Sequence, residues 1–273
     1  MLGHPIAHSK SPDLQLAAYR ELGVDWSYER IDMDASGIAG FVTSRTPAWR
    51  GLSLTMPLKR DVVPVLDSLD EVAALTGAAN TVVFGENGIH GMNTDVFGIV
   101  SALGSTDVSD VLVLGSGATA GSLIVALGEL GAARVVVAAR APERAAPLAV
   151  IAERIGLDVT VTDLATPPAG EPTLVVSTLP GGTSLPWPVA DAHIRSSTLF
   201  DVAYDPWPSA LASTWSRAGR PVISGLEMLV AQALGQVRVF VSGDPTLSVT
   251  DEPSVLAAMR ASVDLDGPAN AAH

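Results

Sequence analysis

Lysine is rare in this chain, and one of its lysines stands where a proton-transfer group could work. The sequence has 273 residues with 16 Lys and Arg residues, of which only Lys10 and Lys59 are lysines. Arginine stays protonated in proteins, whereas lysine can release its proton when it is partly buried. Lys59 follows Pro57 in a segment, 51–60, that predicts a strand and then a helix begun by the proline. Lys59 is therefore a candidate acid–base group, and a solvated surface lysine is the alternative.

Three polar residues are expected at the ends of two neighbouring strands. Residues 77–84 turn into a strand, and a hairpin leads to a second strand that ends before a predicted helix over 96–103. Asn80, Thr94 and Asp95 lie at these ends, where open α/β sheets bind their ligands. The alternative is structural, with Asp95 as the N-cap of the helix and both Asn80 and Asn93 as turn residues.

A glycine-rich turn indicates a phosphate site. Residues 111–128 read VLVLGSGATAGSLIVALG, which is typical of a buried strand, a tight turn and the start of a helix. Gly115, Gly117 and Ala120 fit the pattern G-x-G-x-x-A. The backbone N–H groups and the dipole at such a helix start favour an anionic phosphate. A tight turn without a ligand is the alternative.

The residues after the next strand indicate which dinucleotide would bind. Folds that bind NAD usually carry an acid about 20 residues beyond the turn, where it bonds the ribose 2′-hydroxyl. Arg140 stands there instead, and Arg144 follows one helical turn later. Two guanidinium groups could hold a 2′-phosphate, so the sequence predicts NADP rather than NAD. An ordinary surface pair of Arg140 with Glu143 is the alternative.

The region around this turn predicts a doubly wound, Rossmann-like parallel sheet. Strand-like and helix-like segments alternate there, which is the pattern of an α/β fold. The expected strands are 111–114, 134–139, 159–162, 174–177, 198–202 and 221–224.

The rest of the chain predicts a second α/β domain that C-terminal helices complete. The expected elements include a helix capped by Ser11, a strand over 26–31, and helices over 62–75, 225–241 and 251–262. We expect residues 1–103 with 225–263 to form a substrate-binding domain and 104–224 an NADP-binding domain. Residues 264–273 predict a disordered tail.

Composition excludes several classes of function. The net charge of −13 argues against nucleic acid or an anionic membrane as a partner. The chain has no cysteine, and His4 and His8 lack a third ligand, so no metal is expected. The N-terminus lacks the pattern of a signal peptide. We expect a cytoplasmic protein, monomeric or homodimeric, whose partner is a small molecule.

Several spaced motifs together resemble the shikimate dehydrogenase family over residues 3–243. They are S-x-S-P at 9–12, T-x-P-x-K at 55–59, G-A-x-N-T at 77–81, G-x-N-T-D at 91–95, the glycine-rich turn, D-V-x-Y-x-P at 201–206 and G-x-x-M-L-x-x-Q-A at 225–233. Each motif is modest alone, whereas their order and spacing are highly specific.

The resemblance implies NADP-dependent interconversion of 3-dehydroshikimate and shikimate in aromatic amino acid biosynthesis. Lys59 and Asp95 would be the pair at the reacting oxygen, where a cationic lysine can stabilise and protonate negative charge. The residues implied for the substrate are Ser9, Ser11 and Tyr204 at its carboxylate, and Thr55, Asn80 and Gln232 with Asp95 at its ring hydroxyls. Those implied for the cofactor are Gly115, Ser116, Gly117, Ala118, Thr119, Ala120, Arg140, Arg144, Thr178, Leu179, Gly225 and Met228.

The chain departs from the family pattern at several positions. Ser53 stands where asparagine is common, and Gln15 replaces a frequent histidine or asparagine. Near the cofactor motifs the departures are Ala118, Ala139, Ala141 and Ser177. They bear on cofactor affinity and stability more than on the reaction.

Two other functions stay open at this point. One is a quinate/shikimate dehydrogenase that uses NAD, against which stand Ser9, Ser11 and Arg140. The other is a non-catalytic NADP-binding sensor. The presence of Lys59 and Asp95 argues against a sensor, because it needs no proton-transfer group.

Overall fold

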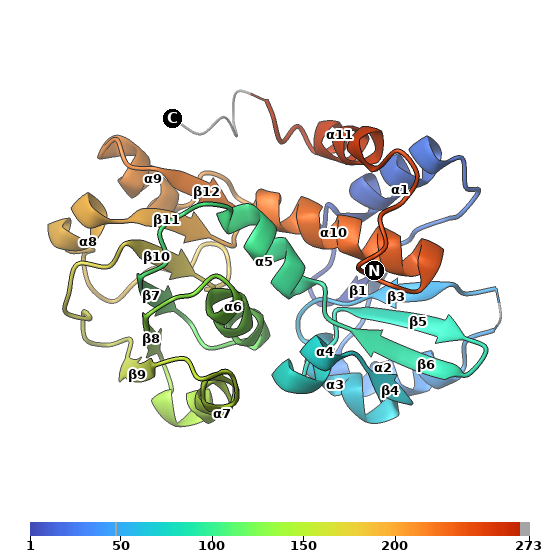
Figure 1. Cartoon of the computed structure of the whole chain (residues 1–273), viewed down its shortest axis with the longest axis horizontal. Coiled ribbons are helices and arrows are strands. Elements are labelled where there is room, and N and C mark those ends of the chain that lie inside the picture. The colour runs from blue at the N-terminus through green and yellow to red at the C-terminus, as the bar shows by residue number, and fades with distance from the viewer. Residues whose placement is uncertain (47, 268–273) are drawn as a thin grey trace. The chain divides into compact units, whose positions relative to one another are not determined.

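The chain folds into two units, and it passes between them twice. The computed structural model describes residues 1–46 and 48–267. Unit 1 comprises Met1–Gly98 and Leu229–Gly267, and unit 2 is built from Ile99–Met228 (Figure 1). The chain therefore passes between the units within helix α5 (Asp95–Leu103) and within helix α10 (Gly225–Ser242).

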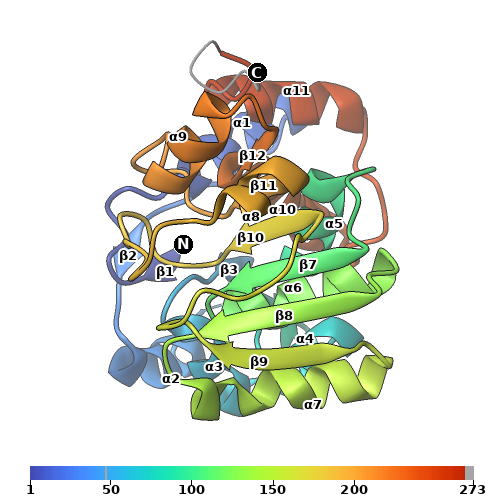
Figure 2. The same ribbon diagram turned by 90° about the vertical axis from the view of Figure 1, so that its left-hand side faces the viewer.

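Unit 2 is built on the parallel six-stranded sheet that the sequence predicts. Its strands are β7 (Asp110–Leu114), β8 (Arg134–Ala139), β9 (Val159–Asp163), β10 (Leu174–Ser177), β11 (Thr198–Asp201) and β12 (Val222–Ser224). Their order across the sheet is β12-β11-β10-β7-β8-β9, and every pair is parallel (Figure 2). This is the Rossmann order: β8 and β9 are added on one side of the first strand, β7, and β10, β11 and β12 on its other side. The predicted fold class is confirmed.

Helices cover both faces of this sheet (Figure 1). They are α6 (Ala118–Glu129), α7 (Ala146–Ile155), α8 (Asp191–Ser196) and α9 (Ala210–Arg217), with a 3-10 turn, η2, at Pro142–Ala145. Trp215 of α9 is fully buried with Leu114 and Leu199 in the core against the sheet. Its indole N–H donates to Ser197 Oγ at 3.1 Å, which satisfies the polar end of the ring.

Unit 1 holds a mixed four-stranded sheet in the order β3-β5-β6-β4. Its strands are β3 (Gly51–Ser53), β4 (Ser68–Leu69), β5 (Thr81–Gly85) and β6 (Gly88–Met92), and a separate parallel pair joins β1 (Leu2–Gly3) to β2 (Ile31–Asp32). The helices are α1 (Ser11–Leu22), α2 (Ala35–Thr43), α3 (Leu58–Asp61), α4 (Glu71–Thr76) and α11 (Glu252–Ser262), with a 3-10 turn, η1, at Val63–Val65.

The helix expected over 62–75 is wrong. The segment divides into η1, the short strand β4 and helix α4. Pro64 lacks the N–H that a continuing helix needs. Asp70 then caps a new helix, because its carboxylate accepts from Ala73 N at 2.6 Å. The strand expected over 26–31 is also shorter, with only Ile31 of that range in β2.

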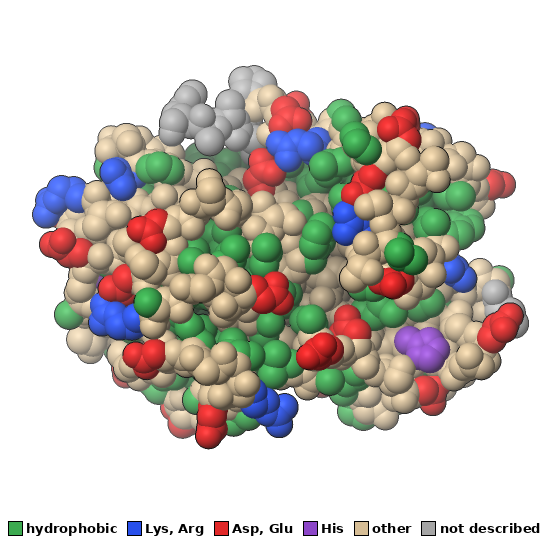
Figure 3. Space-filling model, viewed as in Figure 1, with side chains coloured by type: hydrophobic (Ala, Val, Ile, Leu, Met, Phe, Trp, Pro, Cys, Tyr) green, Lys and Arg blue, Asp and Glu red, His purple; other side chains and the backbone are tan. Residues whose placement is uncertain are grey.

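The surface and the C-terminal end add two observations. Acidic and basic side chains are interspersed over the face seen in Figure 3. Within the described ranges no helix has both the length and the apolarity to cross a bilayer.

Residues 264–267 of the expected disordered tail form turns in which Leu265 is buried. The rest of that tail, 268–273, lies outside the described residues.

His193 of α8 predicts a loss of stability in acid. The ring is buried, and within the described part of the chain its Nδ1 has no hydrogen-bond partner. Burial lowers the pKa of His193 from its usual 6.5. The unfolded chain therefore binds this proton first, so the stability that His193 contributes is complete above about pH 6.5 and is lost as the pH falls towards its folded pKa.

Chemical denaturation of wild type and His193→Leu between neutral and mildly acidic pH tests this prediction. The free energy of unfolding of wild type should fall more steeply, by at most about 1.4 kcal/mol per pH unit for one proton. Burial raises the pKa of Asp70 and Asp201, which act in the opposite sense, and both chains keep these groups. Parallel curves for the two chains would contradict the assignment to His193.

Candidate functional site

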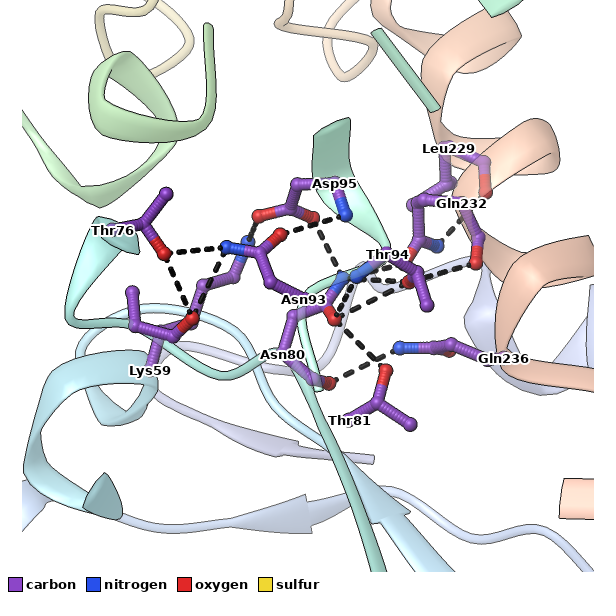
Figure 4. A network of polar contacts seen from close by, with 11 residues as sticks. Lys59, Thr76, Asn80, Thr81, Asn93, Thr94, Asp95, Leu229, Gln232 and Gln236 are labelled. Carbon is purple, nitrogen blue, oxygen red and sulfur yellow. Dashed lines mark hydrogen bonds and ion pairs between the residues drawn. The ribbon is translucent and has the colours of Figure 1, made fainter. Parts of the chain in front are cut away.

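A buried ion pair joins two of the predicted site residues. Lys59 Nζ of α3 donates to Asp95 Oδ2 of α5 at 2.6 Å (Figure 4). The two side chains are 13% and 3% exposed. An ammonium group carries three donors, so the pairing leaves Lys59 able to donate to a substrate oxygen. The solvated surface lysine considered above does not match this burial.

The Asp95 side chain is free for this pairing because its residue starts the helix and does not cap it. Helix α5 begins at Asp95, whose backbone N–H donates to Asn93 Oδ1 at 3.0 Å. Asn93 Nδ2 in turn donates to Thr76 Oγ1 and to the carbonyl of Ala78, both at 3.1 Å. The alternative of Asp95 as the N-cap is therefore wrong: α5 begins at Asp95, and Thr94 before it accepts the first helical bond, from Gly98 N at 3.0 Å. The Asp95 carboxylate points to Lys59 and Asn80 (Figure 4).

Asn80 holds the second oxygen of Asp95. Its Nδ2 donates to Asp95 Oδ1 at 2.7 Å, and its Oδ1 accepts from Thr94 N at 2.9 Å and from Thr81 Oγ1 at 2.8 Å. A backbone N–H can only donate, so the oxygen of the Asn80 amide must face Thr94 and the nitrogen must face Asp95. The Asn80 amide therefore holds the Asp95 carboxylate in a fixed orientation.

Helix α10 contributes Gln232 to the same cluster. Its Oε1 accepts from Asn80 Nδ2 at 3.2 Å, and its Nε2 donates to Leu229 O at 2.9 Å. Thr94 Oγ1 also donates to the carbonyl of Gln232, at 3.0 Å. The structure thus brings together Lys59, Asn80, Asp95 and Gln232 from four separate parts of unit 1 (Figure 4).

The predicted serines lie at the start of α1. Ser11 N donates to Ser9 Oγ at 3.3 Å, and the carbonyl of Ser9 accepts from Arg30 Nε and Nη2 at 2.9 and 2.7 Å. The expected N-cap role of Ser11 is wrong, because α1 begins at Ser11 and Lys10 occupies the cap position. Both serines are buried, at 8% and 1% exposure, beside the first turn that Pro12 starts.

The two remaining residues implied for the substrate lie in different units. Thr55 follows β3 in unit 1, and its carbonyl accepts from Leu58 N at 2.8 Å, so it starts the turn that leads to Lys59. Tyr204 follows β11 in unit 2 and is half-buried.

The glycine-rich turn of unit 2 has the local geometry that a phosphate needs. Gly115 has φ +108°, and a Cβ there would lie 2.6 Å from Thr178 Oγ1, so only glycine fits. Helix α6 begins at Ala118 with Gly117 as its cap residue and no side-chain cap. Its first backbone N–H groups therefore face outward for a ligand. The turn and the first turn of α6 hold Gly115, Ser116, Gly117, Ala118, Thr119 and Ala120.

Both predicted arginines are exposed beside this sheet edge. Arg140 comes directly after β8, and Arg144 lies in η2. Among the residues that the structure describes, neither guanidinium forms an ion pair, so the proposed surface pair of Arg140 with Glu143 does not form.

Four further residues implied for the cofactor belong to unit 2. Thr178 and Leu179 follow β10, and Thr178 Oγ1 donates to Leu114 O at 3.1 Å. Gly225 and Met228 lie in the first turn of α10. A Cβ on Gly225 would lie 2.0 Å from the carbonyl of Val202, so that position accepts no side chain.

Sequence reasoning missed two residues that support the site. Asn93 was expected only as a turn residue, although an asparagine two positions before Asp95 can accept from that residue's N–H. Gln236 was not singled out, although it stands four residues after Gln232 on the same apolar face of a helix, where a buried amide needs partners. A second glutamine on that apolar face was the sequence feature that could have identified Gln236 as a supporting residue.

The parallel sheet with its glycine-rich turn, and the buried Lys–Asp pair of unit 1, define the class of two-domain α/β oxidoreductases. The family model described as the shikimate dehydrogenase substrate binding domain matches residues 1–82. Shikimate dehydrogenase (NADP(+)) of Methanothermobacter thermautotrophicus is 30% identical over 264 residues, which cover 92% of this chain and 93% of that protein.

Solved structures agree with this assignment. Mycobacterium tuberculosis shikimate dehydrogenase has 38% sequence identity and a TM-score of 0.79, with 95% of this chain and 97% of that chain covered. The Thermus thermophilus shikimate 5-dehydrogenase in complex with NADP(H) and shikimate has 32% identity and a TM-score of 0.80, with 96% and 97% covered. The chain belongs to the shikimate dehydrogenase family.

Proposed function

We propose that this chain reduces 3-dehydroshikimate to shikimate with NADPH and catalyses the reverse oxidation. The observation that carries the proposal is the Lys59–Asp95 pair, 2.6 Å apart and buried, in a chain of this family. We place the reaction in the cytoplasm and expect a monomer or a homodimer.

The pair supplies the proton that the reaction needs. Reduction of a ketone places negative charge on its oxygen, and Lys59 Nζ stabilises that oxygen and then gives it a proton. In the oxidation Lys59 removes the proton from the substrate hydroxyl. Asp95 holds the amine of Lys59 in place, and Asn80 holds Asp95. Neutral groups of Ser9, Ser11, Thr55, Tyr204 and Gln232 bind the other polar groups of the substrate.

The residues of unit 2 fit NADP. Gly115 adopts the positive φ that the tight turn needs, α6 offers backbone donors to phosphate, and Arg140 and Arg144 can pair with a 2′-phosphate. NADPH, when bound, supplies the hydride that the substrate carbon receives. Thr178, Leu179, Gly225 and Met228 are the further contacts that we propose for it.

A spectrophotometric assay that crosses shikimate and quinate with NADP+ and NAD+ tests the proposal. Turnover should be fastest with shikimate and NADP+, as followed by the absorbance of the reduced nicotinamide. Faster turnover of quinate with NAD+ would replace the proposal with a quinate dehydrogenase. No turnover in any combination, together with NADP+ binding by calorimetry, would favour the sensor.

A further inference from the structure

Three buried polar side chains meet beside the site without touching Lys59 or Asp95. Gln236 comes from α10, Ser53 from β3 and Gln15 from α1, and their exposed fractions are 2%, 1% and 0%. Ser53 Oγ donates to Gln236 Oε1 at 2.8 Å, and Gln15 Nε2 donates to the same oxygen at 3.3 Å. Ser53 and Gln15, two departures from the family pattern, therefore meet on one residue of this chain.

Gln236 reaches the site through the backbone of Asn80. Its Nε2 donates to Asn80 O at 3.1 Å. A carbonyl oxygen can only accept, so this bond fixes the nitrogen of the Gln236 amide towards Asn80 and its oxygen towards Ser53 and Gln15. Every polar atom of the Gln236 side chain is thus paired in one orientation.

Gln15 donates to Gln236 at the expense of leaving its own side-chain oxygen unpaired among the described residues. Its Nε2 donates to Ala233 O at 3.2 Å as well as to Gln236, while its Oε1 is buried with no partner within the described residues. An unpaired buried carbonyl destabilises a fold. The donors of Gln15 are therefore what it contributes, and they act on Gln236 and on the backbone of α10.

Asn80 is the point where this cluster and the Lys59–Asp95 pair meet. Its backbone is held by Leu54 N, which donates to Asn80 O at 2.7 Å, and by Asn80 N, which donates to Met92 O at 3.1 Å. Gln236 adds the side-chain bond to the same carbonyl. The Asn80 amide then faces Asp95 at 2.7 Å, so a rotation of this backbone unit would move that amide away from the carboxylate.

We propose that Gln236 is a positioning residue, oriented by Ser53 and Gln15, that acts on the reaction through Asn80. The inference rests on the proposed function. It adds to Lys59 and Asp95 a side chain of α10 that contacts neither of them. This side chain acts on Asp95 through Asn80.

A double-mutant cycle tests the proposal, with kcat and KM for shikimate measured at saturating NADP+. Gln236→Leu should lower kcat by about 10-fold, because a small displacement of a catalytic group has effects of this order or larger. KM for NADP+, measured separately at saturating shikimate, should stay unchanged. In the Asn80→Ala background the same substitution should change kcat by less than about 2-fold, since coupled residues are non-additive. Equal losses in the two backgrounds, or an unchanged kcat in Gln236→Leu, would overturn the proposal.

Two controls separate positioning from damage to the fold. Val237→Ala removes a fully buried side chain one residue along α10 and should lower the unfolding midpoint without changing kcat per folded enzyme. If Gln236→Leu does not fold, the double variant Ser53→Ala with Gln15→Leu replaces it in the cycle. It must then lower kcat in the wild-type background and change it by less than about 2-fold in the Asn80→Ala background. Absence of turnover in wild type refutes the proposed function itself, whereas an active wild type with additive variants refutes only the role of Gln236.

Discussion

Lys59→Ala is expected to lower kcat by about 100- to 10,000-fold, the range that removal of a general acid–base group produces. The variant removes the proton donor and also leaves Asp95 as a buried carboxylate without its 2.6 Å partner. KM for NADP+ should stay close to the wild-type value, because the glycine-rich turn and Arg140 belong to the other unit. Steady-state kinetics with shikimate and NADP+ measure both constants.

Two control variants test whether the loss in Lys59→Ala comes from proton transfer or from the loss of a positive charge. Lys59→Arg keeps the positive charge but cannot exchange its proton at ordinary pH, so it should remain at least 10-fold below wild type if proton transfer is required, as expected from the range for this group. Arg60→Ala removes the exposed cation next in the chain and should keep near-normal turnover. Near-normal turnover in Lys59→Ala itself would show that another group moves the proton.

Arg140→Ala is expected to raise KM for NADP+ by about 10- to 100-fold, which corresponds to the loss of one charged hydrogen bond to the 2′-phosphate. KM for NAD+ should hardly change, because NAD+ lacks that phosphate. Arg140 is exposed directly after β8 and, within the described chain, has no ion pair to lose on substitution. The variant should therefore fold as wild type does.

Kinetics with the two cofactors, side by side, decide this prediction. Arg154→Ala is the matched control, because it removes an exposed arginine from the last turn of α7 in the same unit. Equal increases of KM for NADP+ and NAD+ in Arg140→Ala would remove the 2′-phosphate argument. A small effect that becomes large in Arg140→Ala with Arg144→Ala would show that the two guanidinium groups share the phosphate.

The sheet of unit 2 could be predicted from sequence almost residue by residue. Its strands are short apolar runs bounded by glycine, proline or polar turns, and the strand, turn and helix pattern is local. Each observed strand agrees with its predicted range to within one residue at either end. In unit 1 the local signal at 62–75 was misleading, because the pairing of Ser68 and Leu69 with β6 decides the structure there.

The cluster of candidate site residues could be identified from the sequence, but the side chains that support it could not. Lys59, Asn80 and Asp95 carry motifs with fixed spacing, and the structure joins them by hydrogen bonds. The bonds of Gln236 join residues 156, 183 and 221 positions apart. Such contacts depend on how α1, β3 and α10 pack, which no local pattern encodes.

The hydrogen bond from Asp95 N to Asn93 Oδ1 at the start of α5 implies that substitutions at positions 93 and 95 have different effects. A library at Asn93 would be filtered mainly by whether α5 still starts correctly, because the Asn93 side chain accepts from the first N–H of that helix. A library at Asp95 would be filtered mainly by turnover, since the helix start does not depend on that side chain. A library designed to change the reaction should therefore vary position 95 and keep Asn93 constant.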